Sequence, residues 1–208
     1  MKQEILDRIK ELGGNIDEVK NISLKEDLLS ISFNTVLYPR PVDTPWVDGE
    51  EVEPIHGIEE FIDYNKELFL SNKEEFYKKL GDNFFHITEE SYGQMFWTVK
   101  LFTPYTEGTS DFKEWNEYFI NDVNLGEIHK IEDDSKHEFI QIFYSYGFPD
   151  YYYICLSDSN PENPTLFATD HEYFFDEVTN QGNLEDFLKT FMTKDEVVEI
   201  VKKRIEKQ

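Results

Sequence analysis

The sequence predicts an α+β fold, with an antiparallel sheet of about five to six strands and helices packed at the N- and C-terminal ends. Amphipathic segments with helical spacing open and close the chain, and runs rich in Phe, Tyr, Ile and Val fill its second half. The separators between those runs are short, which favours antiparallel neighbours because a parallel crossover needs about a dozen residues or more. We expect a single domain over residues 1–208, with a decorated N-terminal part at about residues 15–80.

The N-terminal residues predict one helix followed by a loop. Apolar residues share one face of the opening helix, and a glycine pair ends it: Ile5, Leu6, Ile9, Leu12 and Gly13-Gly14. Four prolines between residues 37 and 54 predict an irregular loop, which we expect Trp46 to anchor on the body of the protein.

Two more helices are expected before the sheet begins. Apolar side chains fall on roughly one side of residues 57–70, as in an amphipathic helix. Ser71-Asn72-Lys73-Glu74 then matches a capping box, which predicts a second helix that ends at Gly81.

The second half of the chain predicts the sheet and its closing helices. Aromatic and β-branched runs mark six strand candidates at residues 84–88, 94–103, 138–146, 151–157, 165–169 and 172–176. A helix over residues 111–121 interrupts them, since Phe112, Trp115 and Phe119 recur at helical spacing. Asn183 is the expected cap of a helix over 184–192, and Thr193 opens the last helix through a capping box with Glu196.

The charge balance is strongly acidic, with 44 Asp and Glu against 20 Lys and Arg and a formal net charge of −24. Such a field repels nucleic acid and anionic membranes and attracts a basic protein. The alternative is that the charge serves solubility or adaptation to salt. The N-terminus lacks the apolar run of a signal peptide, and no stretch approaches 18 apolar residues, so we expect a cytoplasmic protein with neither a nucleic-acid nor a membrane partner.

The sequence offers no recognisable catalytic or metal-binding constellation. The single cysteine, Cys155, lies in an aromatic run without a basic neighbour, as a buried cysteine does. The five histidines lack metal-ligand spacing, and the phosphate-binding and serine-hydrolase motifs are absent. Carboxylates are so abundant that a glycosidase-like pair carries no information. We therefore predict no catalytic residue, no cofactor and no metal.

One long window of the chain is purely acidic. Between Lys136 and Lys189 there is no Lys or Arg, whereas ten Asp and Glu residues alternate with Tyr-rich strands. Tyr supplies rigid contact area and carboxylates accept Arg, so the window predicts an interface for a basic protein. The candidate contact residues are Asp150, Tyr151, Tyr153, Asp158, Glu162, Asp170, Glu172, Asp176 and Glu177. The alternative is that the aromatic residues form the core and the acids are solvated turns.

Several segments of this region carry a family resemblance. They are the strand pair 140–146 and 151–156, the acidic turn, Leu166-Phe167-Ala168-Thr169-Asp170-His171-Glu172 and Asn183-Leu184-Glu185-Asp186-Phe187-Leu188. With them, residues 139–197 resemble the SUKH superfamily of cell-wall-assembly regulators and bacterial immunity proteins. The family's Leu-Pro-x-x-Tyr segment is not evident before the first strands. The resemblance implies an α+β fold and non-catalytic binding of a toxin domain, often a nuclease.

Charge and resemblance together predict a non-enzymatic acidic binding protein, an immunity protein that neutralises a basic toxin domain. A regulatory or scaffold protein of the same fold, acting on a cellular partner, is the first alternative. An enzyme with an unrecognised carboxylate-based site is the second, for which a cleft holding His171, Asp170 and another carboxylate would be the sign.

Overall fold

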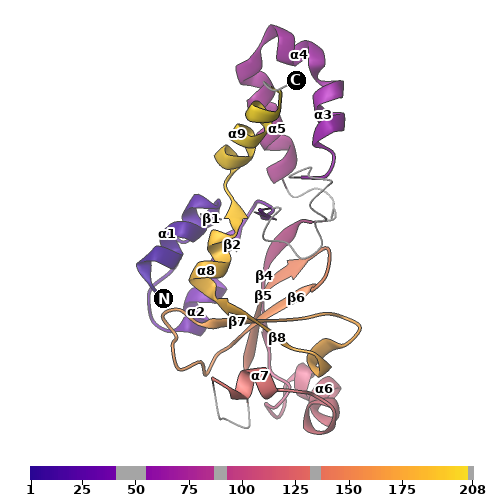
Figure 1. Cartoon of the computed structure of the whole chain (residues 1–208). Helices are drawn as coiled ribbons and strands as arrows, with labels where there is room; N and C mark the ends of the chain where they lie inside the picture. The colour runs from indigo at the N-terminus through magenta and orange to yellow at the C-terminus, as the bar shows by residue number, and fades with distance from the viewer. Residues whose placement is uncertain (41–54, 87–92, 132–136, 206–208) are drawn as a thin grey trace.

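The computed structural model describes residues 1–40, 55–86, 93–131 and 137–205 and confirms the α+β class (Figure 1). Its centre is an antiparallel sheet of five strands in the order β4-β5-β6-β7-β8. These strands are β4 (Met95–Phe102), β5 (Phe139–Ser145), β6 (Tyr151–Cys155), β7 (Thr165–Thr169) and β8 (Thr179–Asn183). Each of the first four pairs with its successor along the chain, and for β5, β6 and β7 the short separators predict this.

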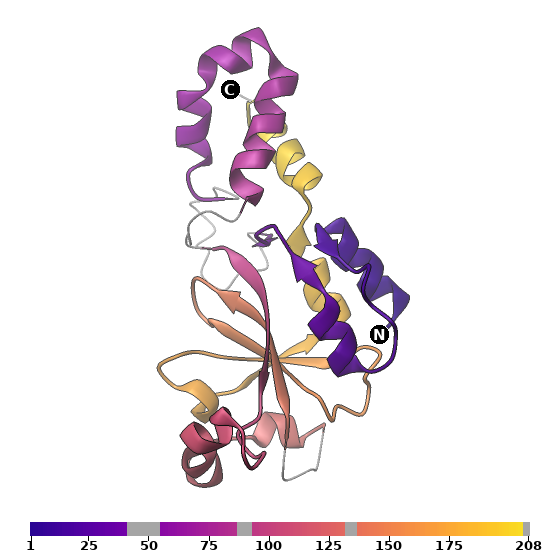
Figure 2. The same cartoon turned by 180° about the vertical axis from the view of Figure 1, so that it is seen from behind.

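One face of the sheet is covered by α1 (Gln3–Glu11), α2 (Leu24–Ser30) and α8 (Leu184–Lys189), which lie together on one side in both views (Figures 1 and 2). We call it the closed face. Its core is largely aliphatic, and Ile5, Ile9, Ile140, Leu166 and Leu188 are fully buried there. The periodic apolar residues of the opening helix are therefore buried against the sheet, as their spacing predicts.

The opposite face, here called the aromatic face, is covered at one end by α6 (Ser110–Asn121), α7 (Gly126–His129) and the 3-10 turn η2 (Phe174–Asp176). Thr109 caps α6, since its hydroxyl accepts the backbone N–H of Phe112. Residues 170–178 form the connection between β7 and β8 and place Phe174 and Phe175 against the rings of α6.

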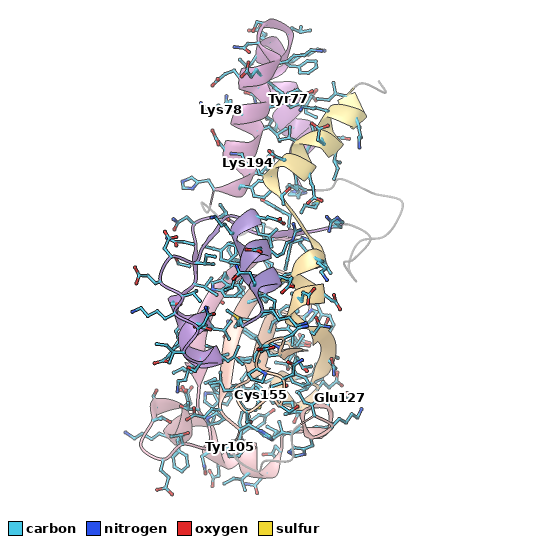
Figure 3. The ribbon with its side chains drawn as sticks, turned by 90° about the vertical axis from the view of Figure 1, so that its left-hand side faces the viewer. Tyr77, Lys78, Tyr105, Glu127, Cys155 and Lys194 are labelled. Carbon is cyan, nitrogen blue, oxygen red and sulfur yellow. The ribbon has the colours of Figure 1, made fainter. Side chains whose placement is uncertain are left out.

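Four helices form a separate layer beyond one end of the sheet: α3 (Ile58–Tyr64), α4 (Lys66–Ser71), α5 (Lys73–Phe85) and α9 (Lys194–Ile205). We call this layer the helical lobe. Figure 3 shows Tyr77, Lys78 and Lys194 in the lobe, and Tyr105 and Glu127 at the opposite end of the molecule. Strand β3 (Tyr38–Pro39) pairs with β9 (Phe191–Met192) between the lobe and the closed face. A third small ladder joins β1 (Gly14–Asn15) to β2 (Ser32–Phe33).

Several predicted boundaries are wrong. The helix expected to end at Gly81 continues to Phe85, so the predicted strand 84–88 is helical at its first two residues. Residues 87–88, and most of the predicted loop with Trp46, lie outside the described residues. The predicted strand 172–176 contains η2 instead, and the helix expected to reach residue 192 ends at Lys189.

Candidate functional site

The aromatic face has a dense ring cluster at the end covered by α6. Alternation along the strands directs Phe102, Phe139, Tyr153 and Phe167 to this face, where all four are buried. The rings of Phe102, Phe139 and Tyr153 meet Phe119 of α6 or Phe175 of the β7–β8 connection at centroid separations of 5.1–6.3 Å. This cluster fixes the positions of α6 and of the connection over the sheet.

A hollow of about 330 Å³ opens beside that cluster, between α6, the sheet and the connection. Its aromatic lining consists of Phe102, Trp115, Tyr151, Tyr153 and Phe174. Its polar lining consists of Lys100, Asp111, Glu114, Gln141 and His171. A pocket that combines aromatic walls with convergent polar groups is typical of a binding site.

Some polar groups of the hollow already form hydrogen bonds within the protein, and others form no ion pair in the part of the chain that the structure describes. Asp111 accepts the backbone N–H of Thr103 at 2.9 Å and its hydroxyl at 3.2 Å. Gln141 donates its amide nitrogen to Thr98 at 3.1 Å. Lys100 and Glu114, by contrast, form no ion pair with the described residues and are exposed. These two side chains are therefore available to a guest.

Tyr153 forms the most deeply buried polar part of the lining. The residue is 5% exposed, yet its hydroxyl makes no hydrogen bond to any residue that the structure describes. Burial raises the pKa of this phenol, so it stays protonated across the physiological range. Its hydroxyl can both donate to and accept from a guest in the hollow.

Asp150 and His171 join the tip of the β5–β6 hairpin to the β7–β8 connection. His171 Nδ1 donates to Asp150 Oδ2 at 2.8 Å, which leaves Nε2 on the outer side of the ring. The hydrogen bond to Asp150 raises the pKa of His171, whose side chain is 69% exposed. Burial raises the pKa of the Asp150 carboxyl, and His171 opposes part of that shift.

Three of the predicted contact acids are buried, which corrects the expectation that the acidic window faces outward together. Asp158 accepts the backbone N–H groups of Asn160 and Thr165. Asp170 accepts those of Glu172 and Tyr173. Asp150 is 8% exposed and holds His171. These carboxylates shape the loops because short acidic side chains replace missing backbone acceptors in turns.

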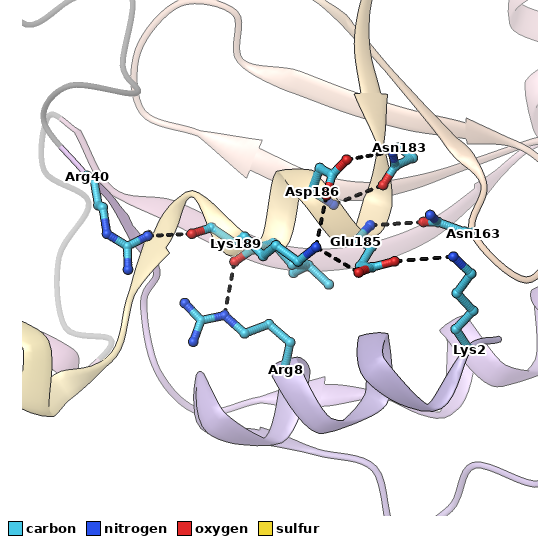
Figure 4. A network of polar contacts seen from close by, with 9 residues as sticks. Lys2, Arg8, Arg40, Asn163, Asn183, Glu185, Asp186 and Lys189 are labelled. Atoms are coloured by element: carbon cyan, nitrogen blue, oxygen red, sulfur yellow. Dashed lines mark hydrogen bonds and ion pairs between the residues drawn. The ribbon is translucent and has the colours of Figure 1, made fainter.

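The remaining acids of the window divide into neutralised and unpaired groups. Glu138 binds Lys25. Glu185 and Asp186 bind Lys189, and Glu185 also binds Lys2, in the polar seam between α1 and α8 (Figure 4). Four candidates are exposed and form no ion pair with described residues: Glu162, Glu172, Asp176 and Glu177. Glu162 lies apart from the others, since its carbonyl accepts the backbone N–H of Lys2.

The structure thus brings together Asp150, Tyr151, Tyr153 and the β7–β8 connection, which carries Glu172, Asp176 and Glu177, and leaves Asp158 and Glu162 elsewhere. It adds α6, whose acids the sequence reasoning missed. Residues 110–122, which comprise α6 and its C-cap, and residues 170–178 of the connection carry one lysine, Lys113, and the carboxylates Asp111, Glu114, Glu117, Asp122, Asp170, Glu172, Asp176 and Glu177. We call these two segments the acidic collar.

A second group of polar side chains lies near α7. His137 and Cys155 are buried with Nδ1 and Sγ 3.4 Å apart, and the rings of His129 and His137 lie 5.5 Å apart. Figure 3 places Cys155 within the body of the protein. Among the described residues no group of three or more His, Cys, Asp and Glu side chains is arranged to hold a metal ion.

Comparisons with family models, curated proteins and solved structures gave no match for this chain. The SUKH resemblance therefore remains a prediction from the sequence pattern. In the part of the chain that the structure describes, every helix is too short or too polar to cross a membrane.

Proposed function

We propose that this protein is a non-enzymatic binding protein that neutralises a basic protein partner, in the manner of an immunity protein against a toxin domain. The observation that carries the proposal is the acidic collar around an aromatic hollow. A net charge of −24 steers a cationic partner toward the protein, and the collar supplies exposed carboxylates that form no ion pair with described residues, among them Glu114, Glu117, Glu172 and Glu177.

Exposed aromatic side chains beside the collar support its assignment as a binding surface. Tyr146 and Phe148 lie on the β5–β6 hairpin, and Tyr173 lies on the connection, with exposures of 45%, 61% and 49%. The Asp150–His171 hydrogen bond joins these two segments. Exposed Tyr and Phe next to charged groups match the composition of protein interfaces.

Charge reversal of exposed collar residues tests the proposal. We choose Glu117→Lys, Glu172→Lys and Glu177→Lys, which lie outside the hollow; reversing Asp150, Asp158 or Asp170 would instead perturb the fold. The matched control reverses Glu18, Asp63 and Glu74, which are equally exposed but distant in sequence and change the net charge equally.

The readout is the association rate with a toxin domain encoded beside the gene, measured at low and moderate salt. We expect the collar variant to associate at least about tenfold more slowly and to lose most of its salt dependence, with a much smaller effect in the control. Equal effects of both variants would contradict a localised binding surface. A gene with no neighbouring toxin would instead favour a regulatory or scaffold protein acting on a cellular partner.

One observation favours a second function. The Asp150–His171 pair borders a hollow that also holds Asp111 and Glu114, and this arrangement resembles an acid–base site. The residues that line the hollow include no Ser, Thr or Cys nucleophile, so such an enzyme would transfer a proton or activate water. An activity lost in His171→Gln but retained in the collar variant would support this enzyme and argue against the binding protein.

A further inference from the structure

We propose that the hollow accepts a single arginine side chain of the partner. The inference rests on the proposed function and deepens it, because it names the partner residue that the site recognises. A volume of about 330 Å³ lies at the small end of the range of ligand pockets, about 300–1,000 Å³, and suits one side chain better than a large cofactor.

The aromatic lining favours a planar cation. Trp115, Tyr151 and Phe174 present π-systems from three different elements, and the Trp115 and Phe174 rings lie 4.9 Å apart. A guanidinium group stacks on aromatic faces and is more weakly hydrated than an ammonium group. The lining therefore selects arginine over lysine.

The polar lining offers acceptors suited to a guanidinium fork. Glu114 is an exposed carboxylate without an ion pair to described residues, and the buried Tyr153 hydroxyl has no hydrogen-bond partner among them. Gln141 uses its amide nitrogen on Thr98, so its carbonyl oxygen is the atom left to accept. Five N–H donors in a fixed plane match several acceptors around one hollow.

Lys100 is the group that opposes this guest. It lines the hollow without an ion pair to the described residues, and together with His171 it would favour an anion. We expect the acidic collar to outweigh these two groups, because Asp111 and Glu114 line the hollow itself and the other collar carboxylates add negative charge on the same two segments. Removing the charge of Lys100 should therefore strengthen the binding of a cationic guest and weaken the binding of an anionic guest.

The test is an NMR titration of the full chain with Nα-acetyl-arginine amide, observed at the Trp115 indole N–H and assigned with Trp115→Phe. We expect a saturable shift with a dissociation constant on the order of 1–10 mM. Nα-acetyl-lysine amide should bind at least about fivefold more weakly, and the citrulline analogue, which keeps the shape without the charge, should bind far more weakly still.

Two variants give opposite signs and do not touch the core. Glu114→Gln should weaken arginine binding about fivefold or more, whereas Lys100→Met should strengthen it about two- to fivefold. Tyr153→Phe keeps the ring and should weaken binding severalfold through loss of the hydroxyl. Weaker binding in Lys100→Met, stronger binding in Glu114→Gln, or no saturable shift at ten times the expected constant would overturn the inference.

The two proposals fail separately. If the arginine probe does not shift the Trp115 indole N–H signal while collar reversal still slows association with the toxin domain, the collar is the binding surface and the arginine site is wrong. If the probe binds but collar reversal has no effect, the hollow is a cation site and the proposed function is wrong.

Discussion

The two faces of the central sheet are covered in different ways. The closed face meets three helices through aliphatic side chains, and a polar seam of Lys2, Arg8, Glu185 and Lys189 ties α1 to α8 along their outer edge (Figure 4). The aromatic face meets α6 and the β7–β8 connection through rings at one end and carries the hollow beside them.

This difference separates stability from recognition. Aliphatic residues on the closed face are buried against one another, which leaves little apolar surface for a partner to contact. The large rings on the aromatic face line a hollow that has polar groups at its edge. We therefore expect substitutions on the closed face to change folding and substitutions around the hollow to change binding.

The largest effect should come from truncating the closed face. Phe143 is 0% exposed and its ring meets Trp97, Tyr152, Phe187 and Phe191. Phe143→Ala should lower the free energy of unfolding by about 3–5 kcal/mol, because it leaves a cavity in a packed core. Tyr151→Ala, at the half-buried edge of the hollow, should cost less than about 1.5 kcal/mol in the same urea titration. Equal losses of unfolding free energy in the two variants would contradict the distinction between a stabilising closed face and a binding aromatic face.

A smaller effect should follow loss of a structural carboxylate. Asp158 accepts two backbone N–H groups at 2.8 and 2.7 Å within its turn. Asp158→Ala should lower the free energy of unfolding by about 1–3 kcal/mol, whereas Glu162→Ala in the same turn should change it by less than about 0.5 kcal/mol. A neutral Asp158→Ala would contradict the assignment of this acid to the fold rather than to a partner.

The Asp150–His171 pair at the edge of the hollow should make the stability of the protein depend on pH. Its hydrogen bond to Asp150 raises the pKa of His171 above the ordinary 6.5, so protonated His171 is favoured in the folded state. The stability from this pair is therefore fully present below pH 6.5 and is lost as the pH rises through the folded-state pKa. NMR titration of the His171 ring should give a midpoint above 6.5 that falls toward it in Asp150→Asn. An unchanged midpoint in that variant would mean that the pair does not form.

The smallest effect is expected in the polar seam. Lys189 binds Glu185 and Asp186 from an exposed position, where solvent screens ion pairs. Lys189→Ala should shift the urea midpoint less than either buried substitution above. A shift as large as that of Phe143→Ala would show that the seam, and not the aliphatic core, holds the closed face.

Much of the fold could be predicted because local patterns agree with tertiary packing. The aromatic runs gave four of the five strands of the main sheet, and Thr193 and Glu196 form the predicted capping box through reciprocal hydrogen bonds. A signal for α2 was present and unused, since Ser23 caps that helix by accepting the N–H of Glu26. Strand β8 was missed because its residues, Thr-Asn-Gln-Gly-Asn, lack any apolar alternation.

Other errors came from contacts between distant segments. Gly81 looked like a helix end, but it lies inside α5, where a side chain would collide with Lys194 of α9. Phe84 and Phe85 looked like a strand, but their rings pack against Phe61 and Tyr38 from a helix. Phe174 has a φ of +35°, so its aromatic run turns instead of extending.

The candidate site could be predicted only in part for the same reason. Tyr151 and Tyr153 were singled out as contact residues by their place among the acids, and the structure places both in the lining of the hollow. Helical spacing identified α6, but the side of the sheet on which it packs depends on the path of the whole chain. Glu114 and Trp115 were therefore missed, and burial of Asp150, Asp158 and Asp170 was not foreseen.

The central claim is that the acidic collar and the hollow, and not the closed face, meet a basic partner. Amide chemical-shift mapping of the labelled protein during titration with the neighbouring toxin domain tests it most directly. We predict that the shifts concentrate in residues 110–122, 146–151 and 170–178 and spare α1 and α8. Shifts that concentrate instead on α1 and α8, or on the helical lobe, would contradict the claim.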